Sequence, residues 1–233
     1  MRCYLNIGNT HTQILSVGSG GSRSIRTVPT AEFDPASLPD GAETAAACVV
    51  AELANILKSR GTCMVTPEAA SEFVDFSLVD ASTIGQDRVA NAVYLAAKAV
   101  LPAVSLDFGT CITAEVIGDQ KRFLGGAICP GRTLTRRALN LYTSKLPFVE
   151  LADELPPCPG ANTIDAIRLG TDAAAVDAVA GFLARIEKML GRRPTVYACG
   201  GDRAFFLRAP GLAGRMIDGK DDFTLRGVEL LFG

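Results

Sequence analysis

Residues 104–117, Val-Ser-Leu-Asp-Phe-Gly-Thr-Cys-Ile-Thr-Ala-Glu-Val-Ile, contain the strand–turn–strand pattern that decides the fold. The apolar residues at both ends of this stretch predict two buried strands. Gly109 and Thr110 predict a tight turn between them, where a glycine lets the backbone approach a ligand and a threonine offers an N–H and a hydroxyl group. Asp107 stands where the first strand ends. This combination suits the phosphates and the cation of a nucleotide; the alternative interpretation is an ordinary hairpin without a ligand.

The same pattern occurs near the start of the chain. Residues 4–15 are Tyr-Leu-Asn-Ile-Gly-Asn-Thr-His-Thr-Gln-Ile-Leu, and residues 5–10 align with residues 106–110 with one extra residue, Asn9, in the first copy. Two copies about a hundred residues apart indicate a duplicated α/β unit rather than a solenoid. A duplicated fold presents equivalent turns to one cleft, so both turns are candidates for holding one nucleotide. Chance similarity between two short segments is the alternative.

Strands and helices alternate along both halves of the chain, which predicts an α/β fold. Apolar spacing predicts a helix over 89–100, and Thr163 is predicted to N-cap a long helix over 164–190. The other predicted strands are 24–28, 45–50, 63–66, 104–108, 113–117, 122–128 and 195–199, and the other predicted helices are 52–60, 133–142 and 225–232.

Composition and charge exclude several classes of function. The chain has 233 residues, of which 48% are hydrophobic and 21% charged, as expected for a soluble globular protein of one domain or two small lobes. A net charge of −2 argues against nucleic acid as the main partner. No apolar run is long enough to span a bilayer, and the first residues lack a signal-peptide pattern, so we expect a cytoplasmic protein without membrane contact.

The cysteines and the single histidine give no sign of a metal cluster or a nucleophile. The seven cysteines are scattered without a Cys-x-x-Cys pair, which fits buried thiols better than disulfides or zinc ligands. With His11 as the only histidine, neither a His-based metal cluster nor a Ser–His triad is available. His11 itself is interpreted as a polar turn residue.

Gly85-Gln86-Asp87-Arg88 directly precedes the helix predicted over 89–100. An acid beside a base at a helix start is most often a cap with a surface ion pair. In a nucleotide cleft the pair has a different use, because Asp87 can accept the proton of an attacking hydroxyl while Arg88 holds an anionic group. A carboxylate base suffices for phosphoryl transfer, whose loose transition state depends mainly on positioning.

Taken together, the ordered motifs resemble those of the type III pantothenate kinase family. The likeness extends from Leu5 to Gly200-Gly201, nearly the whole chain, and its specificity lies in the order and spacing of short motifs. These motifs are Ile7-Gly8-Asn9-Thr10, Cys48-Val49-Val50-Ala51-Glu52-Leu53, Gly85-Gln86-Asp87-Arg88, Asp107-Phe108-Gly109-Thr110, Gly125-Gly126-Ala127-Ile128-Cys129-Pro130-Gly131, Lys145-Leu146-Pro147, Val149-Glu150-Leu151 and Asn162-Thr163.

The resemblance implies an actin-like fold of two ribonuclease-H-like lobes, here 1–102 and 103–233, with a nucleotide cleft between them. It implies a transferase that moves the γ-phosphate of ATP to the primary hydroxyl of pantothenate, giving 4'-phosphopantothenate in the first step of coenzyme A biosynthesis. Magnesium, a monovalent cation (potassium or ammonium) and a homodimer are implied as well.

The resemblance also implies roles for individual residues. Asp87 matches the family's catalytic base, and Asp107 matches a ligand of the monovalent cation. Thr163 matches a residue that contacts pantothenate across the dimer interface. The implied ATP and phosphate contacts are Asn6, Gly8, Asn9, Thr10, Thr12, Gly109 and Thr110, and the implied pantothenate contacts are Gly85, Gln86, Asp87, Arg88 and Thr163.

The chain departs from the family pattern mainly at the magnesium site. Asn6 stands where most members have aspartate; an asparagine keeps an oxygen for a metal or its water but lacks the charge that magnesium prefers. Asp80-Ala81 replaces a usual Asn-Pro, Leu78 occupies the place of a tyrosine, and Ile112 replaces a common threonine. We therefore expect an active but divergent kinase.

Two alternatives stay open from the sequence. One is a catalytically weak homologue that acts as a ligand-binding regulator, since some relatives are described as accessory transcriptional activators. The other is a different actin-like sugar or acid kinase, against which the short length and the Gly-x-Asp-Arg motif argue.

Overall fold

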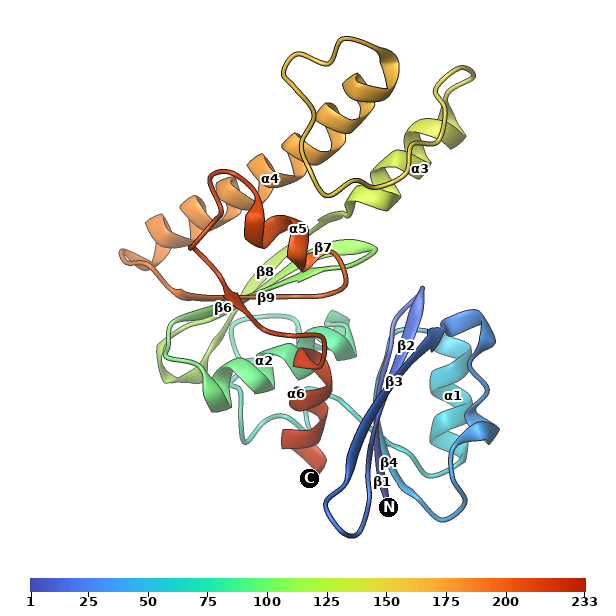
Figure 1. Cartoon of the computed structure of the whole chain (residues 1–233). Helices are drawn as coiled ribbons and strands as arrows, with labels where there is room; N and C mark the ends of the chain where they lie inside the picture. The colour runs from blue at the N-terminus through green and yellow to red at the C-terminus, as the bar shows by residue number, and fades with distance from the viewer. The chain divides into compact units, whose positions relative to one another are not determined.

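The computed structural model describes residues 1–233, and their packing divides the chain into two compact units. Unit 1 combines the N-terminal part of the chain with two later segments. Unit 1 contains Met1–Ala103, Glu115–Gly125 and Asp222–Gly233, and unit 2 contains Val104–Ala114 and Gly126–Asp221. The first and the last residues of the chain therefore both belong to unit 1 (Figure 1).

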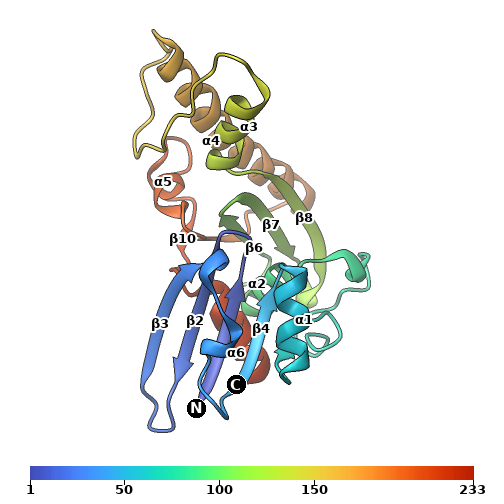
Figure 2. The same cartoon turned by 90° about the vertical axis from the view of Figure 1, so that its right-hand side faces the viewer.

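The first sheet consists of β1 (Arg2–Ile7), β2 (His11–Val17), β3 (Arg23–Pro29), β4 (Glu43–Cys48) and β5 (Cys63–Met64). Its strand order is β3-β2-β1-β4-β5. Figure 2 labels β3, β2 and β4 of this sheet. Strand β1 pairs antiparallel with β2 and parallel with β4. Apolar side chains of these strands form one core cluster, which includes Leu5, Ile7, Ile14, Ala46 and Cys48.

The second sheet consists of β6 (Ala103–Phe108), β7 (Cys111–Ile117), β8 (Phe123–Pro130), β9 (Thr195–Cys199) and β10 (Ile217–Asp218). Its strand order, β8-β7-β6-β9-β10, repeats the order of the first sheet position by position. Strand β6 therefore corresponds to β1, and β9 corresponds to β4. This shared order confirms the duplicated, ribonuclease-H-like α/β fold that the repeated strand–turn–strand pattern predicted.

Helices cover both faces of the first sheet. Helix α1 (Ala51–Ser59) contacts β4 on one face, while α2 (Gln86–Lys98) and α6 (Phe223–Phe232) lie on the other (Figure 1). Gly227 lets α6 approach α2 closely, because a Cβ there would lie 2.6 Å from the carbonyl carbon of Ala90. The buried side chains of Thr224 and Asn91 add a hydrogen bond of 2.8 Å between the two helices.

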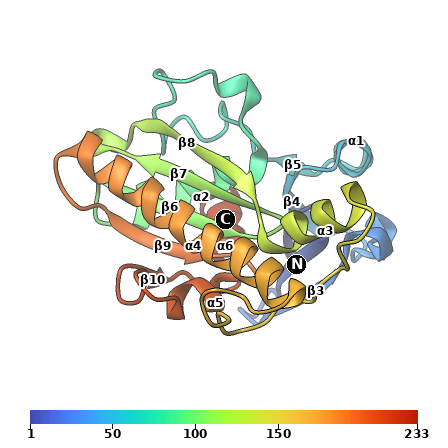
Figure 3. The ribbon, with the colours of Figure 1, turned by 90° about the horizontal axis from the view of Figure 1, so that it is seen from above.

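Unit 2 carries α3 (Arg132–Tyr142), α4 (Thr163–Leu190) and α5 (Arg203–Arg208). Helix α3 packs against α4, and α4 runs along the second sheet (Figure 1, Figure 3). Short 3-10 turns cover 30–32, 35–37, 81–83 and 119–121. None of the helices is both long and apolar enough to span a membrane.

Most predicted elements are present with small shifts in their bounds. Helix α2 begins at Gln86 rather than at 89, so Asp87 lies in its first turn. The prediction that Thr163 caps α4 is wrong by one residue: Asn162 is the N-cap, and its side-chain oxygen accepts a hydrogen bond from the N–H of Asp165 at 2.9 Å. Asparagine is at least as good a cap as threonine, so the residue one position earlier takes this role.

Helix α5 and strand β10 were not predicted from the sequence, because both are too short to show a periodic apolar pattern. The division into lobes 1–102 and 103–233 stays a prediction. Close packing groups α6 with the N-terminal elements.

Candidate active site

The turn after β1 is a rigid loop with an exposed tip. The N–H of Gly8 donates to the carbonyl of His11 at 3.0 Å, and the N–H of Thr30 donates to the carbonyl of Thr10 at 2.9 Å. Asn9 and Thr10 are exposed. A side chain at position 8 would press on the carbonyl of His11, since its Cβ would lie only 3.3 Å away. The backbone of this turn is thus fixed while its tip is open to a ligand.

Thr12 supports this turn from below and offers no surface to a ligand in this structure. It is fully buried, and its hydroxyl lies 3.0 Å from the hydroxyl of Thr30. The Thr30 hydroxyl donates in turn to the carbonyl of Gly8 at 2.8 Å. The predicted phosphate contact at Thr12 therefore becomes, in our interpretation, an indirect role through Thr30 and Gly8.

Asn6 lies half-buried at the end of β1 and is oriented by its neighbour on β2. Its amide Nδ2 donates to Oε1 of Gln13 at 3.3 Å. That hydrogen bond leaves the side-chain oxygen of Asn6 as the atom that suits a cation or a bound water. The chain contains no group of three or more His, Cys, Asp or Glu residues that could hold a metal ion. A magnesium ion here would therefore depend on nucleotide phosphates for several of its ligands, which is a usual mode for this ion.

Asp87 lies in the first turn of α2 and is largely shielded from solvent. Burial raises the pKa of its carboxyl group, while the N–H and the charge of Arg88 act in the opposite direction. Its Oδ1 accepts the N–H of Arg88 at 2.8 Å and lies against Gly85, where a Cβ would be only 2.7 Å away. A carboxylate with a raised pKa is a stronger base than an exposed aspartate, and Gly85 leaves the space it occupies.

Gln86 connects the start of α2 to the first sheet. Its side-chain oxygen accepts the N–H of Cys48 at 2.9 Å, at the end of β4. Cys48 is paired with Ile7 at the end of β1, and the N–H of Val49 donates to the carbonyl of Ile7 at 3.0 Å. The turn after β1 and the start of α2 therefore occupy the same edge of the sheet. The carboxyl ends of parallel strands are where α/β folds bind ligands.

Arg88 is held by an acid that the sequence analysis missed. Its Nε lies 2.9 Å from Oε1 of Glu115 on β7, whose side chain is fully buried. Glu115 stands between Ala114 and Val116 in an apolar strand, and a buried glutamate in such a place requires a cationic partner. The place of Glu115 within an apolar strand was visible in the sequence, but the sequence did not show which lysine or arginine pairs with it. The ion pair fixes the guanidinium of Arg88 beside Asp87.

In unit 2, the turn after β6 is enclosed by two close-packed glycines. The N–H of Gly131 donates to the carbonyl of Thr110 at 2.9 Å, and a Cβ on Gly131 would lie 2.7 Å from that oxygen. Gly200, with φ +85°, packs against Phe108 and the carboxylate of Asp107; a Cβ there would lie 2.6 Å from the N–H nitrogen of Phe108. Gly109 and Thr110 themselves are exposed.

The two remaining predicted site residues, Asp107 and Thr163, lie at the end of a strand and at the start of a helix in unit 2. Asp107 is half-buried at the strand end, where its carboxylate oxygens are the kind of donor that a hard cation prefers. Thr163 is the exposed first residue of α4. Within unit 1 the structure thus brings together Asn6, the turn after β1 and the Gly85–Arg88 segment, and within unit 2 it brings together Asp107, Gly109 and Thr110.

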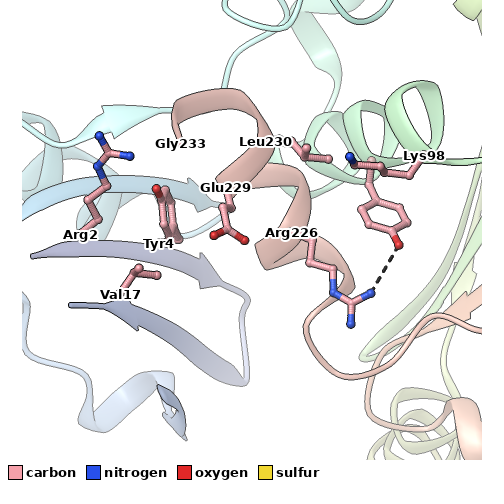
Figure 4. A pocket seen from close by; sticks show the side chains of 9 residues that line it. Arg2, Tyr4, Val17, Lys98, Arg226, Glu229, Leu230 and Gly233 are labelled. Atoms are coloured by element: carbon pink, nitrogen blue, oxygen red, sulfur yellow. Dashed lines mark hydrogen bonds between the residues drawn. The ribbon is translucent and has the colours of Figure 1, made fainter. Parts of the chain in front are cut away.

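A cavity of about 500 Å³ in unit 1 is not part of this group of residues (Figure 4). It lies near the start of β1, between Tyr4, Tyr94 of α2 and Arg226 of α6, and none of the predicted site residues lines it. Three of its charged side chains are bound within the protein: Arg226 Nη1 lies 3.4 Å from the hydroxyl of Tyr94, Glu229 pairs with Arg23 at 2.6 Å, and Arg2 pairs with Glu43 at 3.0 Å. We therefore do not regard it as the candidate active site.

The family of the chain follows from comparison with known sequences. Residues 42–185, more than half of the chain, match the family model of type III pantothenate kinases. The chain belongs to the type III pantothenate kinase family. The match covers the Gly85–Arg88 and Asp107–Thr110 segments and ends before Gly200.

Curated type III pantothenate kinases are similar to the chain over part of their length. The protein of Akkermansia muciniphila is 39% identical over 151 residues, which are 64% of this chain and 60% of that protein. The protein of Halalkalibacterium halodurans is 35% identical over 150 residues, 64% of this chain and 57% of that protein. The kinase of Desulforapulum autotrophicum is 29% identical over 225 residues, 86% of each chain. In the first two relatives the similarity thus spans about three fifths of their length.

Solved structures agree with the fold of this pantothenate kinase family member. A Campylobacter jejuni protein assigned to the Baf family of transcriptional activators has a TM-score of 0.68 at 19% identity, covering 98% of this chain and 96% of that one. A Sinorhizobium meliloti protein assigned as a 2-dehydro-3-deoxygalactonokinase has a TM-score of 0.58 at 14% identity, covering 99% of this chain and 95% of that one. At such identities the likeness concerns the fold alone.

Proposed function

We propose that the chain transfers the γ-phosphate of ATP to the primary hydroxyl of pantothenate, giving 4'-phosphopantothenate. The observation that carries this proposal is the geometry of Asp87, a shielded carboxylate at the start of α2 with a raised pKa and an ion-paired arginine beside it. Membership of the type III pantothenate kinase family supports the choice of substrate.

In this proposal Asp87 accepts the proton of the attacking hydroxyl. Its base strength is increased by burial, and its position is fixed by the N–H of Arg88 and by the space that Gly85 leaves. Arg88 retains N–H groups beyond the one bound to Glu115, since a guanidinium carries five donors. These groups are suited to the carboxylate of pantothenate. Gln86 acts by fixing the helix start, and Thr163 is proposed to contact pantothenate across a dimer interface.

We further assign the two equivalent turns to the nucleotide. The exposed tip of the first turn, Asn9 and Thr10, suits phosphate oxygens, and Thr110 provides the corresponding tip in unit 2. Gly8 and Gly109 shape the two turns, because their N–H groups donate to the carbonyls of His11 and Cys111. Thr12 supports the first of these turns from below. Bound ATP would bring magnesium to the oxygen of Asn6, and the carboxylate of Asp107 would hold potassium or ammonium, which balance the charge of the phosphates. We propose in addition a homodimer and a cytoplasmic location.

The test is a coupled assay of ADP release with purified protein, magnesium and ATP. Pantothenate is compared with a hexose and with acetate as acceptors, in potassium, ammonium and sodium salts. We expect turnover with pantothenate alone, faster in potassium or ammonium than in sodium. Turnover with the hexose or acetate instead would identify another kinase of the same fold. No turnover with any acceptor, together with measurable pantothenate binding, would favour the ligand-binding regulator, for which no observation on this chain speaks at present.

A further inference from the structure

Two buried arginines of α3 form an ionic cluster in unit 2 that the proposed function does not use. Arg132 and Arg136 are one helical turn apart, and they are 2% and 1% exposed. Both bind Asp172 of α4, which is fully buried: Arg132 Nε lies 3.0 Å from Oδ1, and Arg136 Nη2 lies 2.7 Å from Oδ2. Two guanidinium groups on one carboxylate leave a buried positive charge, which requires a further partner.

Asp202 is that partner. Its Oδ1 lies 2.8 Å from Nη1 of Arg132, and its side chain is 22% exposed. The guanidinium of Arg132 also donates to the carbonyl of Ala152 at 2.5 Å and lies 3.5 Å from the ring centre of Phe205. The planar fork of an arginine can make these contacts at once, whereas the single ammonium of a lysine cannot.

The same ion pair reaches the Gly109–Thr110 turn from both sides. The N–H of Asp202 donates to the carbonyl of Phe108, just before the turn, at 2.9 Å. The N–H of Gly131, the residue before Arg132, donates to the carbonyl of Thr110 at 2.9 Å. The ion pair between Arg132 and Asp202 therefore closes a ring of contacts around Gly109.

We propose that this Arg132–Asp202 ion pair is a clamp that positions the Gly109–Thr110 turn for the phosphates of the nucleotide. Arg132 and Asp202 are thus positioning residues, and Asp172 and Arg136 anchor the clamp to α4. Its role in nucleotide binding rests on the proposed function, while the mechanical effect on the turn does not. The close approach of Gly131 to Thr110 means that a small shift of Arg132 passes directly to the turn backbone.

The test compares Asp202→Asn and Arg132→Lys with the parent protein. Asp202→Asn keeps the side-chain size and the backbone N–H but removes the charge. We expect amide hydrogen exchange at Gly109, Gly131 and Asp202 to become about tenfold faster and the Kd for magnesium-ATP to rise about tenfold, the worth of one charge-assisted hydrogen bond. The KM for pantothenate should stay the same.

A matched control is Glu187→Gln. It breaks the 2.7 Å ion pair of Glu187 with Arg215 in the same unit, away from the turn, and should change neither the exchange rates nor the Kd. Unchanged exchange in Asp202→Asn would overturn the clamp, and faster exchange with an unchanged Kd would overturn its role in nucleotide binding. If the parent protein binds no magnesium-ATP while exchange still becomes faster in the variant, the proposed function fails and the clamp stands. Arg132→Lys replaces Asp202→Asn in these comparisons if the latter does not fold.

Discussion

At the scale of single residues, Asp87 shows how a commonplace sequence feature acquires chemical character from its surroundings. An acid before a base at a helix start is usually a solvated cap. Here the carboxylate is shielded, and its pKa is raised by burial. The ion pair between Arg88 and Glu115 prevents the arginine from turning away. If Asp87 acts as the proposed base, we expect its position to depend on Gly85 and Glu115 as well.

We expect Asp87→Asn to lower kcat for pantothenate phosphorylation by about a hundredfold or more, the usual contribution of a positioned base. An asparagine keeps an oxygen for the N–H of Arg88 but cannot accept the proton. The measurement is the steady-state rate with saturating ATP and pantothenate. A variant that turns over at the parent rate would show that another group acts as the base.

The control for this variant is its folding stability. The direction of the expected change in stability follows from the raised pKa of Asp87. The pKa of Asp87 is raised in the folded protein, so the folded state binds more protons and stability falls as the pH rises between the unfolded and folded pKa values. At neutral pH the ionised, buried carboxylate is therefore a cost that Asp87→Asn removes. The melting temperature of the variant should equal or exceed that of the parent, which excludes unfolding as the reason for lost activity.

The raised pKa also predicts the acid limb of the activity profile. Asp87 must be ionised to act as a base, so kcat/KM falls as the pH drops through the pKa of this carboxyl group. Because burial raises that pKa, the fall should begin at a higher pH than for an ordinary aspartate. A profile of kcat/KM that stays flat down to about pH 4, near the ordinary value, would contradict the assignment.

Asn6→Asp should tighten magnesium-ATP binding about tenfold, because a charge a few ångströms from a divalent ion contributes about 1 kcal/mol or more even after screening. The loss of the Asn6 donor is tolerable, since Gln13 can turn its amide and donate to the new carboxylate. Calorimetric Kd values for magnesium-ATP are the measurement. Asn9→Asp is the control: it adds the same charge at the exposed turn tip, where repulsion of phosphate should weaken binding.

At the scale of secondary-structure elements, local patterns predicted most strands and helices, while contacts between distant segments were not predictable. Glycine turns and apolar periodicity revealed the repeated unit, because both depend on neighbouring residues alone. Arg136 falls within the helix predicted over 133–142 and Arg132 directly precedes it, and the sequence pattern gave neither residue a role. Their burial depends on Asp172, which lies on another helix, and nothing in either segment alone specifies that pairing. The same reason explains why the burial of Thr12 against Thr30 was not predictable, and its phosphate contact stays a prediction.

The contact between α3 and α4 gives a stability prediction. Asp172→Asn should lower the free energy of unfolding by about 3–5 kcal/mol, because it leaves two buried guanidinium groups without their shared counter-charge. Urea unfolding followed by circular dichroism measures this change. Asp177→Asn on the same helix is the control, since Asp177 is exposed and the change should be small. Equal midpoints for the two variants would mean that Asp172 does not hold the helices together.

At the scale of the whole molecule, the duplication gives two sheets of the same strand order. The two units differ in that unit 1 also contains the last helix of the chain, α6. Helix α6 packs on α2, β1 and β4, and the Asn91–Thr224 hydrogen bond is buried in that contact. The helix that bears Asp87 is thus supported by a segment far along the chain.

Removal of Asp222–Gly233 should therefore affect the two units unequally. We expect amide protection to be lost in β1, β4 and α2, which contact α6, and kept in β9 and in α4. Hydrogen exchange followed by mass spectrometry measures the difference. Glu229→Gln is the control, because it breaks the ion pair with Arg23 but keeps the helix, and protection should remain throughout. Uniform loss of protection in the truncated chain would show that the units do not fold separately.

The close packing of Gly227 of α6 against Ala90 of α2 can form only after α6 has been synthesised. The ribosome completes every residue of unit 2 before it makes α6, so the second unit can fold while the first still lacks one of its helices. We therefore expect unit 2 to complete its fold before unit 1, the reverse of the usual order in which N-terminal domains finish first. Until α6 arrives, the apolar side of α2 stays uncovered on the nascent chain, and we expect chaperone demand to increase when translation slows over residues 126–221.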